Sequence, residues 1–133
     1  MIERVHHIDF VVRDLDRAAE AYARLLGIEP EPRESLESRG VDVVRFRVGD
    51  LWLILVQPVT DQSPVARFLD EHGEGFFHIA YRVADLDAEA ERLREQGVVA
   101  TGGGVRRGLE GWKLLDLEAT ETAGILSQLV QEP

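Results

Sequence analysis

The sequence predicts an α+β fold made of two related modules, each with the element order βαβββ. Three observations support this prediction. A shift of 71 residues places one stretch of the chain on another, each module opens with an alternating strand, and each of these strands leads into a capped helix. The matching residues include charged and turn residues as well as apolar ones, so an internal duplication explains them better than chance.

Identical short motifs carry the internal match. His7-Ile8 falls on His78-Ile79, and Asp14-Leu15-Asp16 falls on Asp85-Leu86-Asp87. A chain of 133 residues is the length of one compact domain, so the two modules are expected to pack together. We therefore expect a first module at 1–62, a linker helix at 63–75 and a second module at 76–133.

The first module opens with a strand from Val5 to Val12. Its alternation sets Ile8, Phe10 and Val12 on one face and His7 and Asp9 on the other. A helix follows, because Asp14 is a suitable N-cap, apolar residues then keep helical spacing, and Gly27 is a typical stop. Further strands are predicted at Ile28 to Glu34, Val41 to Val48 and Leu51 to Val56, with a tight turn at Gly49-Asp50.

The second module repeats this beginning less regularly. A strand from Phe77 to Val83 sets His78, Ala80 and Arg82 on one face, and a helix follows from the cap at Asp85 to Gly97. Strands are predicted at Val98 to Thr101, Trp112 to Leu117 and Ile125 to Val130, and a flexible glycine-rich loop at Gly102 to Gly111. The linker helix is predicted to begin at Ser63-Pro64 and to end near Gly73.

Composition excludes several classes of protein. The chain has no cysteine, so it has no disulfide, thiol nucleophile or cysteine metal site. Its net charge of −10 disfavours nucleic acid and anionic membranes as partners. No run of about 18 apolar residues is present, which argues against a membrane span. No signal-peptide pattern comes before the first strand, so we expect a cytoplasmic protein.

Several motifs together resemble a known family. They are Val5-His6-His7-Ile8, Val48-Gly49-Asp50, Pro58, Ser63-Pro64-Val65-Ala66-Arg67-Phe68-Leu69, Gly73-Glu74-Gly75, His78-Ile79-Ala80 and Gly124-Ile125-Leu126. With the paired βαβββ modules they resemble the vicinal oxygen chelate superfamily, which includes glyoxalases, bleomycin-resistance proteins and dioxygenases. Within it the likeness is strongest to the methylmalonyl-CoA epimerases. The resemblance implies glyoxalase-like curled mixed sheets around a shared cleft.

The resemblance also implies a metal site. The family's ligand positions fall on His7, Ile54, His78 and Gln128. Isoleucine has no ligand atom and glutamine brings no charge, so a divalent ion (Zn, Co, Ni or Mn) is expected to bind weakly to His7, His78 and Gln128, or not at all. The family's acid–base glutamate falls on Ser38, with Glu37 one residue before it.

The residues themselves leave two questions open. His7 and His78 either converge on one cleft, as the duplication indicates, or are hydrogen-bonded within a half-buried sheet. Arg45, Arg47 and Arg82 lie on the non-apolar faces of their strands. They either bind the carboxylate or phosphate of a ligand or pair with acids of the protein.

Two functions from different classes remain. The first is an isomerase or lyase acting on a small carboxylate or acyl thioester, with His7, His78 and Glu37 as candidate catalytic groups and Arg45, Arg47 and Arg82 as candidate substrate-binding groups. The second is a metal-free protein of the bleomycin-resistance type that sequesters a small molecule. In both cases the expected ligand is small and anionic, and the resemblance implies a homodimer.

Overall fold

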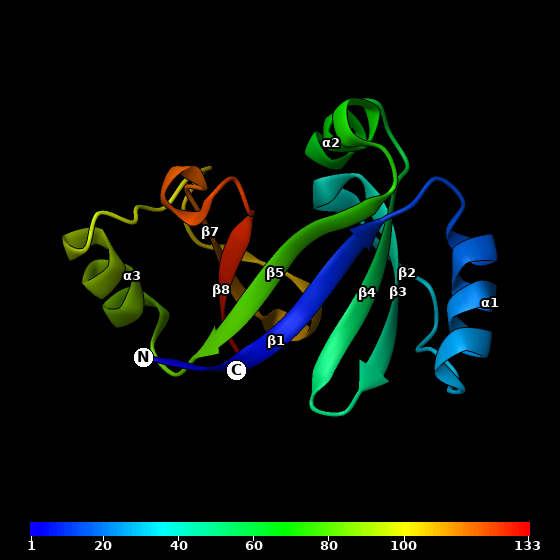
Figure 1. Ribbon diagram of the computed structural model, residues 1–133, viewed down its shortest axis with the longest axis horizontal. Helices are drawn as coiled ribbons and strands as arrows, with labels where there is room; N and C mark the ends of the chain where they lie inside the picture. The colour runs from blue at the N-terminus through cyan, green and yellow to red at the C-terminus, as the bar shows by residue number, and fades with distance from the viewer. The chain divides into compact units, whose positions relative to one another are not determined.

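The computed structural model describes residues 1–133, apart from the side chain of residue 121. The chain divides into two compact units, one made of Ile8–Phe77 and the other of Met1–His7 together with His78–Pro133. Strand β1 (Ile2–Val11) therefore contributes to both units, and so does β5 (Gly75–Val83). Both strands are labelled in Figure 1. The fold is of the mixed α+β class, as the sequence predicts.

The unit at 8–77 is a sheet covered by helix α1. Its strands follow the order β2-β3-β4-β1, and β3 is antiparallel to both β2 and β4. Besides β1, its elements are α1 (Leu15–Leu26), β2 (Glu34–Leu36), the 3-10 turn η1 (Glu37–Arg39), β3 (Val41–Val48), β4 (Leu51–Pro58) and α2 (Pro64–His72).

One face of this sheet forms the core against α1. Phe46 and Leu55 are fully buried there and contact the apolar side of the helix, while Arg45 and Ile54 lie on the opposite face. The predicted strand from Ile28 to Glu34 is wrong: a regular strand begins only at Glu34, and before it Glu31 N donates once to Arg45 O at 2.8 Å. Prolines at 30 and 32 explain the difference, because they have no N–H for a sheet ladder.

The second unit is a mixed sheet covered by helix α3. Its strands follow the order β1-β5-β8-β7-β6, with β8 parallel to β5 and antiparallel to β7. Besides β1 and β5, its elements are α3 (Leu86–Glu95), β6 (Arg106–Arg107), the turn η2 (Leu109–Gly111), β7 (Lys113–Leu117), the turn η3 (Thr120–Thr122) and β8 (Ser127–Gln131). Leucines and valines of β5, β7 and β8 pack against α3.

Two predictions for this unit need correction. The strand predicted at Val98 to Thr101 is reduced to an isolated bridge between Ala100 and Leu117. The predicted flexible loop contains β6, in which Arg106 and Arg107 pair with the start of β7. The three consecutive glycines before this pair account for the short extent of regular structure, since glycine weakens a strand.

The duplication extends to the caps of the two long helices. In one unit Asp14 Oδ1 accepts from Arg17 N at 3.1 Å and Gln57 Oε1 accepts from Leu15 N at 2.8 Å. In the other, the equivalent pairs are Asp85 with Ala88 at 3.0 Å and Gln131 with Leu86 at 2.8 Å. Both units thus bond two of the amides that a helix N-terminus leaves without an intrahelical partner. Because Gln57 and Gln131 are equivalent, so are Ile54 and Gln128, three residues before them.

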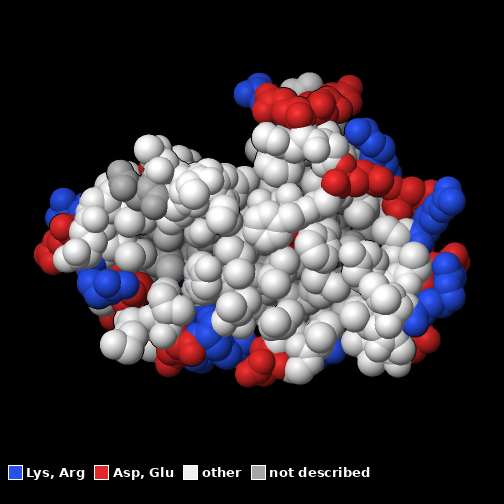
Figure 2. Space-filling model, viewed as in Figure 1, with Lys and Arg blue, Asp and Glu red and all other residues white. Residues whose placement is uncertain are grey.

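Charged side chains lie mainly on the helices and at loops. Acidic side chains gather over α2 in the space-filling view (Figure 2). Among the described residues, no helix is long and apolar enough to cross a membrane.

Candidate functional site

Two histidines meet in the unit that contains both chain ends. His7 of β1 and His78 of β5 have ring centroids 5.6 Å apart, inclined at 63°. Trp112, just before β7, stacks on His7 with centroids 5.6 Å apart and planes at 17°. His7 is buried at 3% exposure, and Trp112 at 4%. The structure therefore brings the predicted pair together and adds an aromatic wall that holds the His7 ring.

Gln128 of β8 adds an amide oxygen to this place. Its Nε2 donates to Asp116 Oδ1 at 2.8 Å. Asp116 is the residue directly opposite Gln128 on β7. Arg106 Nη1 in turn donates to Asp116 Oδ2 at 2.7 Å. Gln128 is 1% exposed, and its Oε1 has no hydrogen-bond donor among the described residues. The amide is thus bonded on its nitrogen side and offers a buried oxygen on the other.

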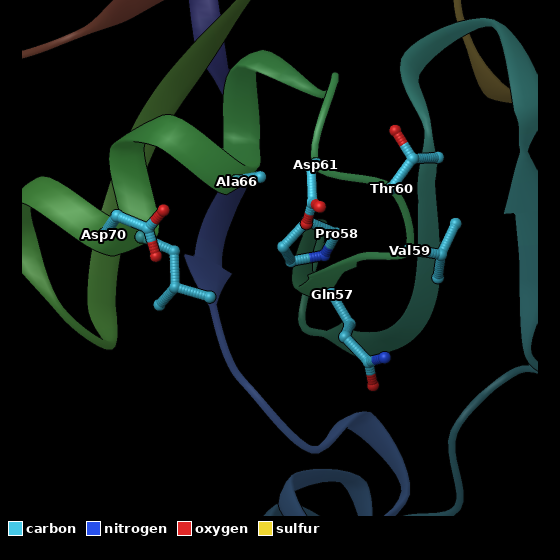
Figure 3. Close-up of a pocket in the computed structure, with 8 residues that line it drawn as sticks. Gln57, Pro58, Val59, Thr60, Asp61, Ala66 and Asp70 are labelled. Atoms are coloured by element: carbon cyan, nitrogen blue, oxygen red, sulfur yellow. The ribbon is translucent and has the colours of Figure 1, made fainter.

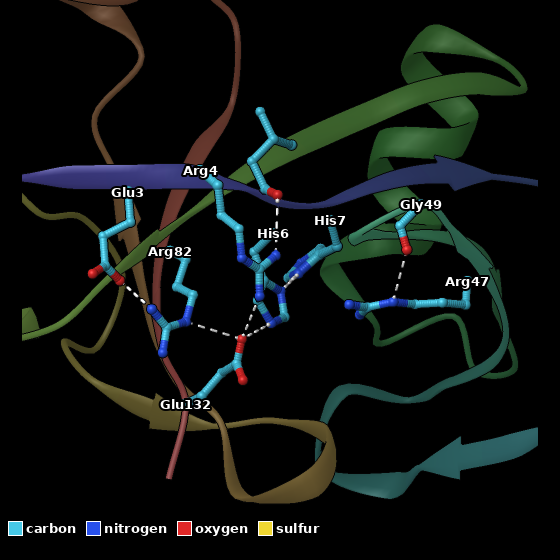
Figure 4. A network of polar contacts seen from close by, with 9 residues as sticks. Glu3, Arg4, His6, His7, Arg47, Gly49, Arg82 and Glu132 are labelled. Atoms are coloured by element: carbon cyan, nitrogen blue, oxygen red, sulfur yellow. Dashed lines mark hydrogen bonds and ion pairs between the residues drawn. The ribbon is translucent and has the colours of Figure 1, made fainter.

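A third histidine, His6, joins His7 to a carboxylate. The Nδ1 atoms of His6 and His7 are 2.8 Å apart, and His6 Nε2 lies 3.2 Å from Glu132 Oε1 (Figure 4). The same oxygen accepts from Arg4 Nη2 at 2.9 Å and from Arg82 Nε at 3.2 Å. We assign the proton of His6 to Nε2, facing the carboxylate, so that its Nδ1 accepts from His7 Nδ1. This tautomer leaves His7 Nε2 as the nitrogen that carries a lone pair.

The environment keeps His7 neutral. Burial lowers its pKa well below the ordinary value of 6.5, and the nearby His78 and His6 lower it further. The oxygen of Gln128 opposes this shift, since it would accept a hydrogen bond from a protonated ring. In the neutral tautomer assigned above no proton points toward Gln128, which agrees with the absence of a donor for its Oε1 among the described residues.

These groups fit a divalent metal with a neutral donor set. His7, His78 and Gln128 supply two imidazoles and one amide oxygen, all in one unit. A buried amide oxygen without a donor is costly, and a cation would satisfy it. Imidazole ligands suit ions such as Zn and Ni, and these three donors bring no negative charge of their own. Ile54, at the equivalent position of the other unit, is buried and has no ligand atom.

Two of the predicted arginines have their contacts within the unit at 8–77. Arg45 and Arg47 belong to β3 in the other unit, where Arg45 is 5% exposed and donates from Nη2 to Glu34 Oε1 at 3.0 Å. Its guanidinium lies 4.5 Å from the centroid of Trp52, and that of Arg47 lies 5.1 Å from the same ring. Arg47 is exposed, and no described carboxylate lies within ion-pair distance of it. Arg45 is thus part of a protein ion pair, whereas Arg47 keeps an uncompensated charge.

Arg82 and Glu37 have different surroundings. Arg82 forms ion pairs with Glu132 and Glu3, so much of its charge is balanced within the protein. Glu37 is exposed and begins the 3-10 turn η1, and Gly40 follows the turn as its C-cap, with a left-handed φ of 66° that lets the chain enter β3. Asp9, buried on the β1 face that His7 occupies by alternation, lies in the part of β1 that belongs to the other unit.

A separate hollow of about 430 Å³ lies beside α2. Thr60 and Asp61 line it from the segment after β4, and Asp70 lines it from the helix (Figure 3). Gln57 also borders it, but its Oε1 caps α1. The two carboxylates make this hollow unsuitable for an anion, so it does not fit the ligand that the sequence predicts.

The sequence patterns do not identify the residues that support the histidines. Neither Glu132 nor Asp116 was singled out, and Trp112 entered only as the start of a predicted strand. Alternation along the strands at 113–117 and 127–131 places Asp116 and Gln128 on the side opposite Leu115, Leu117 and Leu129, and this signal was present in the sequence. The pairing register that makes them direct neighbours was not.

Comparison with known proteins supplies the family. A family model described as the glyoxalase/bleomycin resistance protein/dioxygenase superfamily matches residues 6–115. An ethylmalonyl-CoA/methylmalonyl-CoA epimerase of Cereibacter sphaeroides is 33% identical over 133 residues, covering 98% of this chain and 99% of that protein. The human mitochondrial methylmalonyl-CoA epimerase is 29% identical, covering 96% and 73%. A Streptomyces coelicolor methylmalonyl-CoA epimerase variant, solved in complex with 2-nitronate-propionyl-CoA, has a TM-score of 0.92 and 32% identity, with 99% and 96% covered.

Proposed function

Because the chain belongs to the glyoxalase/bleomycin resistance protein/dioxygenase superfamily, we propose that it is an epimerase-like isomerase acting on a small acyl thioester that carries a carboxylate. The observation that carries the proposal is the meeting of His7, His78 and the buried oxygen of Gln128 in one unit. Solved relatives bind acyl-CoA compounds, including methylmalonyl-CoA, and this supports an acyl thioester as the first ligand class to test.

Epimerisation requires removal of a proton next to the thioester carbonyl and its return on the other face. A cation held by His7, His78 and Gln128 would polarise the carbonyl and stabilise negative charge on its oxygen. The neutral state of His7 suits this role, because only the unprotonated ring can be a ligand. Glu37 is the proposed acid–base carboxylate, since its exposed position at the start of η1 leaves it open to solvent and ligand.

The carboxylate of the substrate requires a cationic partner. We assign this role to Arg47, whose charge is not balanced by a described acid and whose guanidinium the face of Trp52 holds in place. Arg45 then supports Trp52 from within the protein through its pair with Glu34. Arg82 is assigned to the Glu132 network and to holding His6.

One observation favours a second function. Ile54 is the residue of the unit at 8–77 that is equivalent to Gln128, so one of the two duplicated positions holds an apolar side chain without a donor atom. A site with one donor fewer suits a protein that binds a small molecule without a metal and without turnover, as the bleomycin-resistance branch of the superfamily would suggest. We rank this function second, because His7, His78 and Gln128 keep their donor atoms.

Proton exchange separates the two functions. The purified protein is loaded with Co²⁺ or Zn²⁺, incubated with methylmalonyl-CoA in deuterated water, and deuterium at the carbon between the two carbonyls is followed by mass spectrometry. We expect enzyme-dependent incorporation that falls at least tenfold in Glu37→Gln and in His78→Gln. Binding without any incorporation would refute the isomerase and favour the sequestration protein. Light scattering on the same samples tests the predicted homodimer.

A further inference from the structure

Asp116 and Gln128 form a directly opposed pair between β7 and β8. Their register places the two side chains on the same face, and Gln128 Nε2 donates to Asp116 Oδ1 at 2.8 Å. The other carboxylate oxygen of Asp116 accepts from Arg106 at 2.7 Å. The ion pair with Arg106 therefore holds the carboxylate in a fixed position behind the glutamine.

A glutamine amide has two orientations that occupy almost the same space but exchange an acceptor for a donor. A carboxylate only accepts, so Asp116 selects the orientation in which Nε2 faces it. The oxygen of Gln128 must then face the opposite way, where it is buried and lacks a hydrogen-bond donor among the residues that the structure describes. In the register of β5 and β8 Gln128 lies opposite Ala80, so its side chain is on the sheet face that also carries His78.

We propose that Asp116 is a positioning residue that fixes the amide of Gln128 so that its Oε1 serves as the third donor beside His7 and His78. The proposal rests on the donor set of the proposed function. It adds the reason why a glutamine can serve there: a neutral amide needs a partner to point its oxygen inward, whereas a carboxylate at residue 128 would present an oxygen in either orientation.

The same geometry would make Asp116 destabilising if the metal-binding residue at position 128 carried a negative charge. A glutamate at position 128 would place a second carboxylate directly opposite Asp116, and like charges in opposed positions destabilise a sheet pair. The effect of removing Asp116 is therefore expected to change sign with the residue at position 128. An ordinary structural role of Asp116 does not predict such a reversal.

A double-mutant cycle read by Co²⁺ titration tests this. Dissociation constants and the visible Co²⁺ spectrum are measured for the wild-type protein, Asp116→Leu, Gln128→Glu and the double variant. We expect Asp116→Leu to weaken Co²⁺ binding about 10- to 100-fold when residue 128 is glutamine, in line with other supporting partners of metal ligands. In the Gln128→Glu background the same change is expected to leave binding unchanged or to strengthen it.

Two control variants separate orientation from charge. Asp116→Asn keeps an oxygen that can accept from Gln128 and is expected to bind Co²⁺ within about threefold of wild type, because one hydrogen bond is largely retained. Arg106→Gln removes the ion pair but not the acceptor and is expected to behave similarly. A loss of affinity in both backgrounds, or an unchanged affinity in Asp116→Leu with glutamine at 128, overturns the proposal.

An NMR measurement without metal keeps the two proposals distinguishable. With ¹⁵N-labelled glutamine, one side-chain amide proton of Gln128 is expected to be shifted downfield and to exchange slowly in wild type and Asp116→Asn, but not in Asp116→Leu. Identical signals in all three proteins overturn the positioning role. If the signals differ as expected but wild type binds no Co²⁺, the orientation by Asp116 is supported and the metal-dependent function fails.

Discussion

Replacing each of the two arginines of β3 by glutamine is expected to affect a different property: stability for Arg45 and ligand binding for Arg47. Arg45→Gln removes a guanidinium that is 5% exposed, bonded to Glu34 and stacked on Trp52. A charge-assisted hydrogen bond contributes about 1.5–3 kcal/mol and a cation–π contact about 0.5–2 kcal/mol, and the partial exposure of Glu34 reduces the first contribution. We expect a loss of about 2 kcal/mol, which lowers the melting temperature by about 6–12 °C for a chain of this size.

Arg47→Gln removes an exposed guanidinium without a described carboxylate partner, so we expect the melting temperature to change by less than about 2 °C. Binding of methylmalonyl-CoA is expected to weaken about 10- to 100-fold, because one charge-assisted hydrogen bond to the ligand carboxylate is lost. Thermal melting followed by circular dichroism and isothermal titration calorimetry measure the two quantities. Arg24→Gln, an exposed change of the same charge on α1, is the matched control.

A particular pair of results would refute this reasoning. If both β3 variants weaken binding equally and neither melts at a lower temperature, then Arg45 contacts the ligand and its pair with Glu34 has no structural importance. If Arg24→Gln weakens binding as much as Arg47→Gln, the effect comes from overall charge and not from a contact.

Three further predictions concern stability. Gln131→Leu removes the side-chain acceptor of Leu86 N and is expected to lower the free energy of unfolding by about 1 kcal/mol in urea titration. The hydrogen bond from Ser35 and the Arg33 guanidinium lower the pKa of Asp42 from 3.8, so its ionised form stabilises the fold above that pH. Asp42→Asn is therefore expected to be less stable than wild type at pH 7, with a difference that shrinks as the pH falls below 3.8. Gly40→Ala is expected to cost at least about 1 kcal/mol, since φ is 66° and the added Cβ would lie 3.2 Å from a side-chain carbon.

The positions of strands and helices could be predicted from the sequence wherever one apolar face of the element, or a turn residue next to it, determines where it begins and ends. The strand at 41–48 was predicted with its observed bounds, and the helix from Leu15 ended at Gly27 as expected, because alternation and the glycine stop act within a few residues. The segment at 28–34 failed for a local reason as well, since the prolines outweigh its apolar residues. The pair Arg106-Arg107 was missed because so short a strand depends entirely on its partner β7.

The candidate site was predictable in its repeated part only. His7 and His78 were paired by the duplication, and the structure places their rings 5.6 Å apart. The acids Asp116 and Glu132 are not repeated, since the equivalent positions hold Arg45 and Pro58, so only the three-dimensional arrangement shows that they hold Gln128 and His6. Alternation puts Arg45 and Arg47 on the same strand face, so the sequence treats them alike. Only the structure shows that Arg45 is buried and Arg47 is exposed.

The division of the chain has a consequence for its synthesis. The unit at 8–77 is continuous, so it can begin to fold while the ribosome still holds the rest of the chain. The other unit joins the first seven residues to the last 56, and the proposed donors come from positions 7, 78 and 128. Contacts so distant in sequence form late, because a long loop must close first. We therefore expect the donor set to be completed last, so that metal uptake during refolding reports the final step of maturation.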